Sequence, residues 1–405
     1  MSHTSVFAAP FARSADRDFV VRCVLGLAPS GGADIGEVLA AVGEVKPKDA
    51  DAWRSAWQTL GERVWRQAED AAADGRSDTA RWSSLRAANY LAVAVDAASA
   101  ADATDRTAAL FAAHRAAWDA FAADAGVRMS RIDVPLEGAT MPGYLFHADA
   151  AGPRPTIVFV NGSDGSISSL WGTGVAAALA RGFHAYVFDG PGQQSMLFQQ
   201  HVPFRPDWEN VLAPVVEELV SHRYVDERRL VVWGISQAGY WVPRALSGEH
   251  RFAAAVVDPG VVDVSTSWTD HLPASLGKLL DEGKDAQFDR DMALGMRFSH
   301  DLSATWAFRA RPVGVGGYAA VIRRMREFAL TSVEAARIDT PLLITSPEGE
   351  QFWPGQSERL AGMTPNVSHL VRFTAAEGAE GHCEPLARTL VHERVLDWVS
   401  ATIPG

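Results

Sequence analysis

The sequence predicts an α/β protein whose sheet is mostly parallel and doubly wound. From about residue 155 onward, short apolar runs alternate with stretches of helical periodicity, which is typical of a parallel sheet with helices on both faces. Several apolar runs end in small or polar residues, as at residues 161–165, 189–192 and 258–260. Because doubly wound sheets carry their sites at the carboxyl ends of the strands, these turns mark the expected site.

Residues 1–127 are predicted to be helical throughout. Large side chains recur at helical spacing, and breaks at residues 29–32 and 74–75 separate the helices. The recurring positions are Trp53, Trp57, Leu60 and Val64, then Trp82, Leu85, Asn89 and Val93, then Leu110, His114, Trp118 and Phe121. We expect a helical layer packed on the rest of the chain, and its role as a lid over an active site is a hypothesis.

The period changes near residue 128. Residues 131–134 and 143–146 are predicted to be short strands joined by a turn, with Pro135 closing the first of them. Further strands are expected at residues 155–160, 184–188, 231–235, 252–257, 340–345 and 369–373, and helices at 175–181 and 208–221. The chain is expected to end in an amphipathic helix that carries Leu386, Leu390, Val395 and Trp398.

Ser236 lies where an apolar run meets a new helix, in the sequence Gly234-Ile235-Ser236-Gln237-Ala238. This is the pattern of a nucleophile elbow, a sharp strand-to-helix turn whose strained backbone requires small neighbours two residues before and after the serine. Gly234 meets that requirement, and Ala238 stands where glycine is usual. Ser236 is therefore the candidate nucleophile, and the alternative is a serine that only caps the next helix.

A serine nucleophile needs a base and an acid that orients the base, and in the α/β-hydrolase order the acid follows the serine and the histidine comes last. His382 is on a loop beyond the last predicted strand and is the candidate base. Glu350, after the strand at residues 340–345, is the preferred acid. Glu348 and two aspartates after the preceding strand, Asp258 and Asp263, remain alternatives.

The fold so predicted is an α/β-hydrolase fold with a helical N-terminal region and a helical cap. Residues 261–338 interrupt the strand–helix alternation, and an insertion at that point would cover the carboxyl edge of the sheet. The expected division is an N-terminal lid region at 1–127, a first core segment at 128–260, the cap at 261–338 and a last core segment at 339–405.

The oxyanion hole of such a site needs two backbone N–H donors. One is expected from Gln237 and the other from Ser163 or Gly162, on the loop after the strand at residues 155–160. The chain holds 13 tryptophans, and some of its aromatic side chains are expected to line the substrate pocket. The candidates for that pocket are Trp171, Tyr240, Trp241 and Trp353.

Composition excludes several other functions. A net charge of −12 with dispersed Lys and Arg argues against nucleic-acid binding, and the two cysteines, Cys23 and Cys383, are too few for a disulfide framework. No apolar run is long enough for a membrane span, and the N-terminus shows no secretion signal, so we expect a cytoplasmic protein. The histidines lack metal-ligand spacing, so neither a metal nor another cofactor is expected.

Several short motifs together resemble one group of α/β-hydrolases, the family that includes 2,6-dihydroxypseudooxynicotine hydrolase and the fungal hydrolases that shorten polyketide pigment precursors. The likeness runs from about residue 50 to the end. The motifs are at residues 188–193, 207–209, 225–226, 234–236, 258–260, 354–356 and 377–383.

The resemblance implies a helical lid over a capped core, and a serine triad that cleaves a carbon–carbon bond beside a ketone on an aromatic substrate. By motif, Ser236 and His382 match the nucleophile and base, and Glu350 falls where the family usually has aspartate. Ala238 in the elbow and Gln194 after Gln193 depart from the family's glycines, which bears on the shape of the pocket.

The function predicted is hydrolysis of an acyl bond, an ester or a ketone carbon–carbon bond, in a mid-sized, partly aromatic small molecule. Two alternatives are an acyltransferase or thioesterase of a biosynthetic pathway, and a hydrolase-fold protein that binds a ligand without turnover. The helical N-terminal layer also offers a surface for a homodimer.

Overall fold

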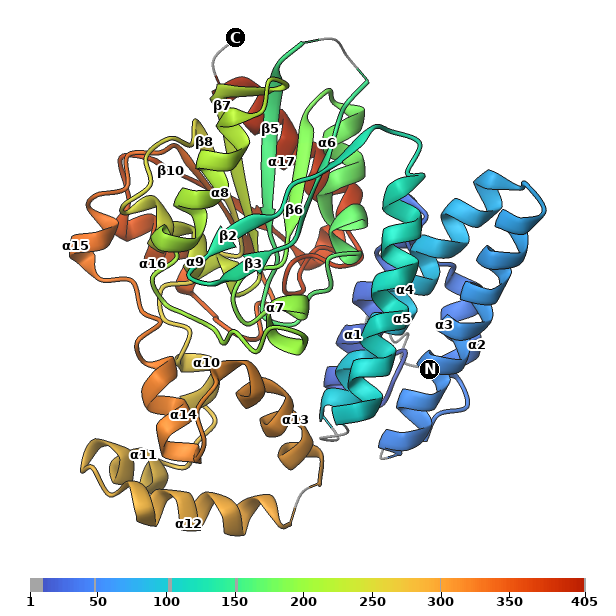
Figure 1. Cartoon of the computed structure of the whole chain (residues 1–405). Helices are drawn as coiled ribbons and strands as arrows, with labels where there is room; N and C mark the ends of the chain where they lie inside the picture. Colours follow the sequence, from blue (N-terminus) through green and yellow to red (C-terminus); the bar gives the residue numbers. More distant parts are fainter. Residues whose placement is uncertain (1–9, 47–48, 101–103, 150–151, 299, 404–405) are drawn as a thin grey trace.

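An eight-stranded sheet positions the site (Figure 1). The computed structural model describes residues 10–46, 49–100, 104–149, 152–298 and 300–403. The spatial order of the strands is β1-β4-β6-β5-β7-β8-β9-β10. Their bounds are β1 Met129–Arg131, β4 Gly143–Phe146, β6 His184–Phe188, β5 Arg154–Val160, β7 Val225–Ile235, β8 Ala254–Asp258, β9 Leu342–Pro347 and β10 Ser368–Phe373. The inner strands β4, β6, β8 and β9 and the second half of β7 are buried, whereas the edge strands β1 and β10 are partly exposed.

Only the first part of the sheet is antiparallel. β4 pairs antiparallel with both β1 and β6, whereas β6, β5, β7, β8, β9 and β10 pair in parallel. β7 is central, with Gly234 opposite Val160 of β5 and Val257 of β8. The carboxyl ends of β5, β7 and β8 therefore meet at one edge, as the alternation of strands and helices predicts.

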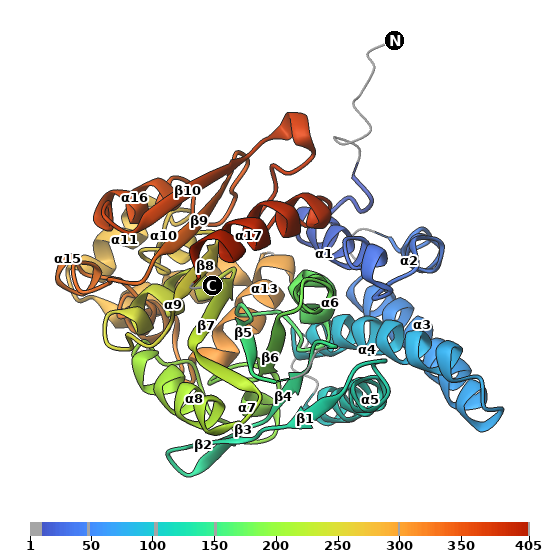
Figure 2. The same cartoon turned by 90° about the horizontal axis from the view of Figure 1, so that it is seen from above.

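Successive side chains of the strands point alternately into two hydrophobic layers, one on each face of the sheet. Val231 and Trp233 of β7 face the layer that holds α6 (Ala176–Ala180) and α17 (Arg388–Thr402). Val232 and its counterparts face the opposite layer, which holds α8 (Glu209–Ser221), α9 (Ala238–Leu246) and α16 (Gln356–Met363). Figure 2 shows the sheet between these two helical layers.

The N-terminal helices pack on the α6 and α17 side of the sheet (Figure 2). They are α1 Ala15–Leu25, α2 Ile35–Val42, α3 Ala50–Ala73, α4 Ser77–Ala100 and α5 Thr104–Ala123. Asp34 and Asp49 cap α2 and α3 by accepting from the backbone N–H groups of Glu37 and Ala52. The indole of Trp118 in α5 meets the ring of Tyr144 in β4 edge to face, with ring centroids 5.5 Å apart.

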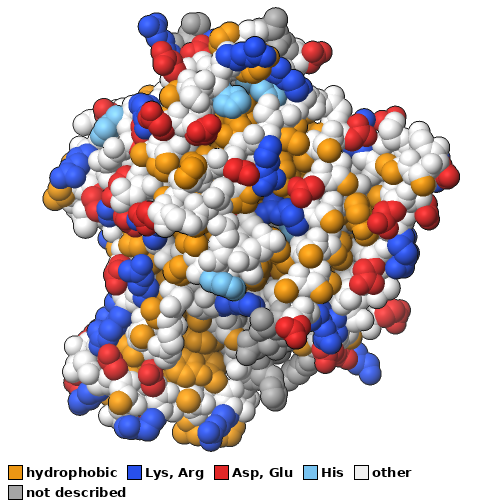
Figure 3. Space-filling view, in the orientation of Figure 1, with side chains coloured by type: hydrophobic (Ala, Val, Ile, Leu, Met, Phe, Trp, Pro, Cys, Tyr) orange, Lys and Arg blue, Asp and Glu red, His pale blue; other side chains and the backbone are white. Residues whose placement is uncertain are grey.

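Residues between β8 and β9 form a separate layer of short helices below the carboxyl edge of the sheet (Figure 1). The helices are α10 Thr266–Thr269, α11 Ala274–Asp281, α12 Asp285–Met296, α13 His300–Ala310, α14 Tyr318–Met325 and α15 Ser332–Ala335. We call this layer the cap. Its α11, α12 and α14 share a small hydrophobic cluster around Phe288 and Ile322. Figure 3 shows hydrophobic side chains on the visible face of the cap, at the lower left.

Three sequence-based boundaries differ from the structure. The strand expected at 131–134 is divided between β1 and β2 (Val134–Leu136), and Pro135 lies inside β2, not at a strand end. β2 pairs with β3 (Ala139–Met141) in a separate two-stranded sheet, where every position is an edge position that tolerates proline. A π-turn at Trp171–Val175 precedes α6, and Leu386 lies before α17.

Within the described residues, none of the helices has the length and apolar character needed to cross a bilayer.

Candidate active site

Ser236 lies at the turn between β7 and α9 with a positive backbone φ of 56°. That conformation is strained for a residue with a side chain, and close packing holds it. A Cβ at Gly234 would come within 2.6 Å of the Ala238 carbonyl oxygen, and one at Gly239 would overlap the carbonyl oxygen of Pro259. Glycine is therefore required at position 239 as well as at 234, and Ala238, between the serine and Gly239, is fully buried.

His382 connects the serine to a carboxylate. Its Nε2 lies 2.8 Å from Ser236 Oγ, and its Nδ1 lies 2.7 Å from Glu350 Oε2. The imidazole is buried, with 2 % of its surface exposed. Ser236 follows β7, Glu350 follows β9 and His382 follows β10, so three separate loops at one edge of the sheet bring these side chains together.

Glu350 is held as an ionised acceptor. Its second oxygen accepts from the backbone N–H groups of Phe352, at 2.8 Å, and Trp353, at 3.1 Å. Burial acts to raise the pKa of Glu350, but the charge of His382 and the hydrogen bonds from His382 and the two N–H groups outweigh it and lower that pKa. A carboxylate fixed in this way orients the ring so that Nδ1 carries the proton and Nε2 faces Ser236.

The other three candidate acids have different partners. Glu348 is exposed and accepts from the backbone N–H of Ala375 at 2.8 Å. Asp258 accepts from Thr345 Oγ1 at 2.8 Å, and Asp263 accepts from Ser265. Of the carboxylates that the sequence offered, Glu350 is the one that the structure places against His382 Nδ1.

Two backbone N–H groups beside Ser236 are without an acceptor among the described residues: those of Ser163 and Gln237. The N–H of Gly162 instead donates to Asn161 Oδ1 at 2.9 Å, which favours Ser163 of the two alternatives. A Cβ at Gly162 would lie 2.6 Å from the Ser236 Cβ, so this loop passes directly against the serine. The arrangement fits an oxyanion hole.

Gln193 fixes that loop, a role that the sequence analysis missed. Its Nε2 donates to the carbonyl oxygens of Asn161, at 2.6 Å, and Gly162, at 3.0 Å, and its Oε1 accepts from the N–H of Gly190 at 2.7 Å. The motif at 188–193 contained this residue, but its contact with the loop after β5 exists only in the folded chain.

Aromatic rings surround His382. The ring of Phe352 lies 4.8 Å from the imidazole, Trp353 lies at 5.6 Å, and Phe19 of α1 lies at 5.9 Å, each measured between centroids. Arg309 of the cap lies over the Phe352 ring at 5.5 Å. The surroundings of His382 therefore include side chains of the N-terminal region and the cap, and Phe19 and Phe352 were not among the predicted pocket residues.

The other three residues predicted for the pocket, Trp171, Tyr240 and Trp241, are buried rings that pack elsewhere in the core, and their contact with substrate stays a prediction. Trp171 is buried against Phe121 and Phe146 on the side of the N-terminal helices. Tyr240 and Trp241 belong to the core on the α8 side of the sheet. Of the four predicted residues, Trp353 is the one whose ring lies next to His382.

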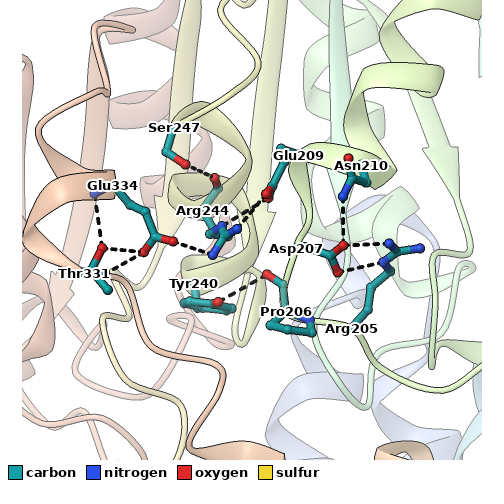
Figure 4. Close-up of polar contacts among 10 residues, drawn as sticks. All are labelled: Arg205, Pro206, Asp207, Glu209, Asn210, Tyr240, Arg244, Ser247, Thr331 and Glu334. Atoms are coloured by element: carbon teal, nitrogen blue, oxygen red, sulfur yellow. Dashed lines mark hydrogen bonds and ion pairs between the residues drawn. The ribbon is translucent and has the colours of Figure 1, made fainter.

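Figure 4 shows the polar contacts that hold α9, the helix that follows Ser236. The Tyr240 hydroxyl donates to the Pro206 carbonyl oxygen at 3.2 Å. The Arg244 guanidinium lies between two carboxylates and donates to Glu209, at 2.6 and 3.1 Å, and to Glu334 at 2.5 Å. These bonds join α9 to the start of α8 and to α15.

Among the described residues, no group of three or more His, Cys, Asp and Glu side chains could hold a metal ion.

The strand order and the site define the class of protein. A family profile, the prolyl oligopeptidase family, matches residues 181–291, a segment that contains Ser236. Among solved structures, the 2,6-dihydroxy-pseudo-oxynicotine hydrolase superposes with a TM-score of 0.68 at 19 % identity, covering 94 % of this chain and 95 % of that one. At that identity the likeness shows the fold.

Two curated relatives match over nearly their whole length. Hydrolase LUC6 from a Fusarium species is 30 % identical, and the match covers 94 % of each chain. The 20-hydroxy-prefusarin hydrolase FUS2 from Gibberella moniliformis is 28 % identical, again with 94 % of each chain covered. The chain belongs to the α/β-hydrolase family, and it is a hydrolase.

Proposed function

We propose that this hydrolase uses Ser236 as its nucleophile, His382 as general base and acid, and Glu350 as the group that orients His382. The observation that carries the proposal is the position of His382, which lies within hydrogen-bonding distance of both partners through its two different nitrogens. The bond cleaved is an acyl bond, an ester or a carbon–carbon bond beside a ketone.

In the first half of the reaction, Ser236 Oγ attacks the substrate carbonyl while His382 Nε2 takes its proton. The carbonyl oxygen gains negative charge, which the N–H groups of Ser163 and Gln237 would stabilise. The charge on Glu350 stabilises the imidazolium that forms. When the tetrahedral intermediate collapses, the proton on Nε2 passes to the leaving alkoxide or carbanion, and the acyl group stays on Ser236.

In the second half, water attacks the acyl-enzyme and gives a proton to His382 Nε2. Collapse of the second tetrahedral intermediate returns that proton to Ser236 Oγ and releases a carboxylic acid. The net reaction adds one water across the cleaved bond and consumes no cofactor.

The substrate class we propose is a mid-sized, partly aromatic or polyketide-like metabolite of a secondary pathway. The aromatic rings around His382 support it, because rings of Phe19, Phe352 and Trp353 offer edge-to-face contacts to a planar substrate. The name of the relative FUS2, a 20-hydroxy-prefusarin hydrolase, agrees with such a substrate.

Turnover of a panel of aryl esters and aromatic β-diketones tests the proposal. Ser236→Ala should lower kcat by about three to six orders of magnitude, and His382→Ala should do the same. Ser221→Ala is the matched control, because Ser221 is exposed at the end of α8 and should leave kcat unchanged. Near-normal kcat in Ser236→Ala would refute the mechanism. Ligand binding without any product would indicate a binding protein.

A further inference from the structure

Two residues beyond His382 lies a carboxyl group that no partner in the structure explains. Glu384 has none of its surface exposed, and neither of its carboxyl oxygens accepts a hydrogen bond from the described residues. An ionised carboxylate left in that state would cost several kcal/mol. The carboxyl group of Glu384 must therefore be either protonated or engaged in an interaction that the hydrogen bonds above do not include.

The side chain of Asp258 lies within hydrogen-bonding reach of Glu384. Asp258 is also fully buried, at the end of β8. Its Oδ1 accepts from Thr345 Oγ1 at 2.8 Å, whereas its Oδ2 accepts no hydrogen bond from the described residues. Arg388 Nη1, itself buried and without a hydrogen bond to the described part of the chain, lies 3.6 Å from that Oδ2.

Asp258 also lies directly beneath the proposed nucleophile. Its backbone carbonyl oxygen accepts from the N–H of Ser236 at 2.6 Å and from Cys383 Sγ at 3.1 Å. Cys383 is the residue between His382 and Glu384. One aspartate thus contacts the elbow that carries the serine and the loop that carries the histidine.

Charge counting decides where the proton lies. Two carboxylates and one guanidinium, all buried, would leave a net negative charge, whereas one added proton makes the group neutral. Asp258 Oδ1 accepts a hydrogen bond from the hydroxyl of Thr345, and Arg388 Nη1 lies 3.6 Å from its Oδ2. The charge of Arg388 acts on Glu384 as well, but neither carboxyl oxygen of Glu384 accepts a hydrogen bond from the described residues, so the proton belongs on Glu384.

We propose that Glu384 is a positioning residue: it carries a proton at neutral pH and donates a hydrogen bond to Asp258 Oδ2, which holds the His382 loop against the Ser236 elbow. The proposal rests on the roles proposed above for Ser236 and His382. It gives a partner to the unexplained Oδ2 of Asp258 and to one of the two unexplained oxygens of Glu384.

The electrostatic surroundings agree with this assignment. Burial and then the charge of Asp258 raise the pKa of Glu384 well above 4.5, with a smaller contribution from Glu350, and only Arg388 opposes them. The Cys383 thiol is next to it, and burial raises its pKa as well, so it adds no charge to the group at neutral pH. Burial likewise raises the pKa of Cys23, which faces Arg388 from α1, to about 12.

The backbone shows why the loop needs such a contact. Cys383 and Glu384 have positive φ angles of 57° and 40°, a conformation that is strained for residues other than glycine. The bond between Glu384 and Asp258 would offset that strain. Without it, we expect the loop to relax and His382 to move away from Ser236 Oγ.

Infrared difference spectroscopy of the intact chain tests the proton directly. At about pH 8 ordinary carboxyl groups are ionised, so the spectrum of the wild type minus that of Glu384→Gln should show the carbonyl band of a protonated acid. Glu380→Gln, an exposed position on the same loop, should give no such band. If the band is missing from the Glu384→Gln difference, the proposal is overturned, whatever the enzyme's activity.

Kinetics test the positioning. A glutamine amide at this position would keep a donor for Asp258, so Glu384→Gln should retain kcat within about threefold, whereas Glu384→Ala should lower kcat roughly 10- to 100-fold with KM unchanged. If folded Glu384→Gln loses as much kcat as Glu384→Ala, the hydrogen bond is not what positions His382. Should Glu384→Ala not fold, the glutamine variant and the infrared band still decide. Failure of the serine mechanism would show separately, as an unaffected Ser236→Ala.

Discussion

Two helical additions flank the hydrolase core, and they are built differently. The N-terminal helices share one continuous hydrophobic cluster with the sheet, in which Trp57 and Tyr90 belong to the same core as Phe159 and Trp233. The outer part of the cap instead forms a cluster of its own, with five buried residues that include Phe288 and Ile322, whereas Val321, Met325 and Ala335 of the cap join the core cluster on the α8 side of the sheet. It also leaves Leu294 and Phe298 exposed, at 55 % and 84 %.

Polar contacts follow the same division. Arg115 of α5 makes a buried ion pair with Asp189 at the end of β6, and Gly26 after α1 packs against the Pro385 backbone, near His382. The cap reaches the N-terminal region through Arg311, whose Nη1 donates to Ser99 Oγ of α4 at 2.9 Å. From this difference we expect the N-terminal helices to fold with the core, and the outer cap helices α11 and α12, which pack in the separate cluster, to unfold locally more readily.

Removing a core ring from the N-terminal region should have the largest effect on stability. Trp118 is fully buried against β4, so Trp118→Ala should lower the free energy of unfolding by about 3–5 kcal/mol. Because the region shares the core, urea unfolding followed by helix content and by loss of esterase activity should give one shared transition at a lower midpoint. Two separate transitions would contradict a common core.

How much of this the sequence could predict depends on whether the signal is local. The elbow at Ser236, the order of acid and base, and the interrupted alternation at the cap are local patterns. The structure places Ser236 and Glu350 each within hydrogen-bonding distance of His382. Phe19 is about 360 residues from His382 in the chain, and no spacing rule connects such positions.

Glu384 and Pro135 show the other limit. Glutamate side chains are usually exposed, so nothing in the sequence marks Glu384 as buried. The structure shows that its carboxyl group is buried beside Asp258. Pro135 was expected to end a strand, but the antiparallel pair of β2 and β3 accepts it inside. In both cases tertiary pairing outweighs the average behaviour of the residue type.

A buried histidine offers a pH test of the same comparison. Burial, and then the charge of Arg115, lower the pKa of His114 in α5 from 6.5 to about 4. The native state therefore binds this proton less readily than the unfolded chain. The contribution of neutral His114 to the free energy of unfolding is therefore fully present above pH 6.5. It is lost as the pH falls from 6.5 toward 4, by up to about 3 kcal/mol.

His114→Asn should reduce the pH dependence of stability between about pH 6.5 and 4, because asparagine can still donate to the Ala88 carbonyl without titrating. Urea midpoints across that range measure it. The matched control is His271→Asn, at an exposed position of the cap, which should leave the pH dependence as it is. Equal effects of the two variants would contradict the buried role of His114.

The equivalent deletion in the cap should act locally. Phe288→Ala empties the centre of the cap cluster, so we expect hydrogen exchange in α11, α12 and α14 to accelerate while the global free energy of unfolding changes by less than about 1 kcal/mol. KM for bulky substrates should change more than kcat for a small ester. A global loss as large as that of Trp118→Ala would show that the cap is part of the main core.

The smallest effect is expected at the exposed ring of the cap. Phe298→Ser should change the free energy of unfolding by no more than about 0.5 kcal/mol, since the ring is 84 % exposed. Differential scanning calorimetry of the variant and the wild type measures the change. A loss of several kcal/mol would mean that Phe298 is covered in solution.

The reactivity of Ser236 is the most direct test of the central claim, that His382 and Glu350 activate this serine. Intact-mass measurement of a fluorophosphonate adduct should be made on the wild type, Ser236→Ala, His382→Ala and the Ser221→Ala control. The account predicts one adduct on the wild type and the control, and none on the two site variants. An adduct that persists on Ser236→Ala, or none on the folded wild type, would contradict it.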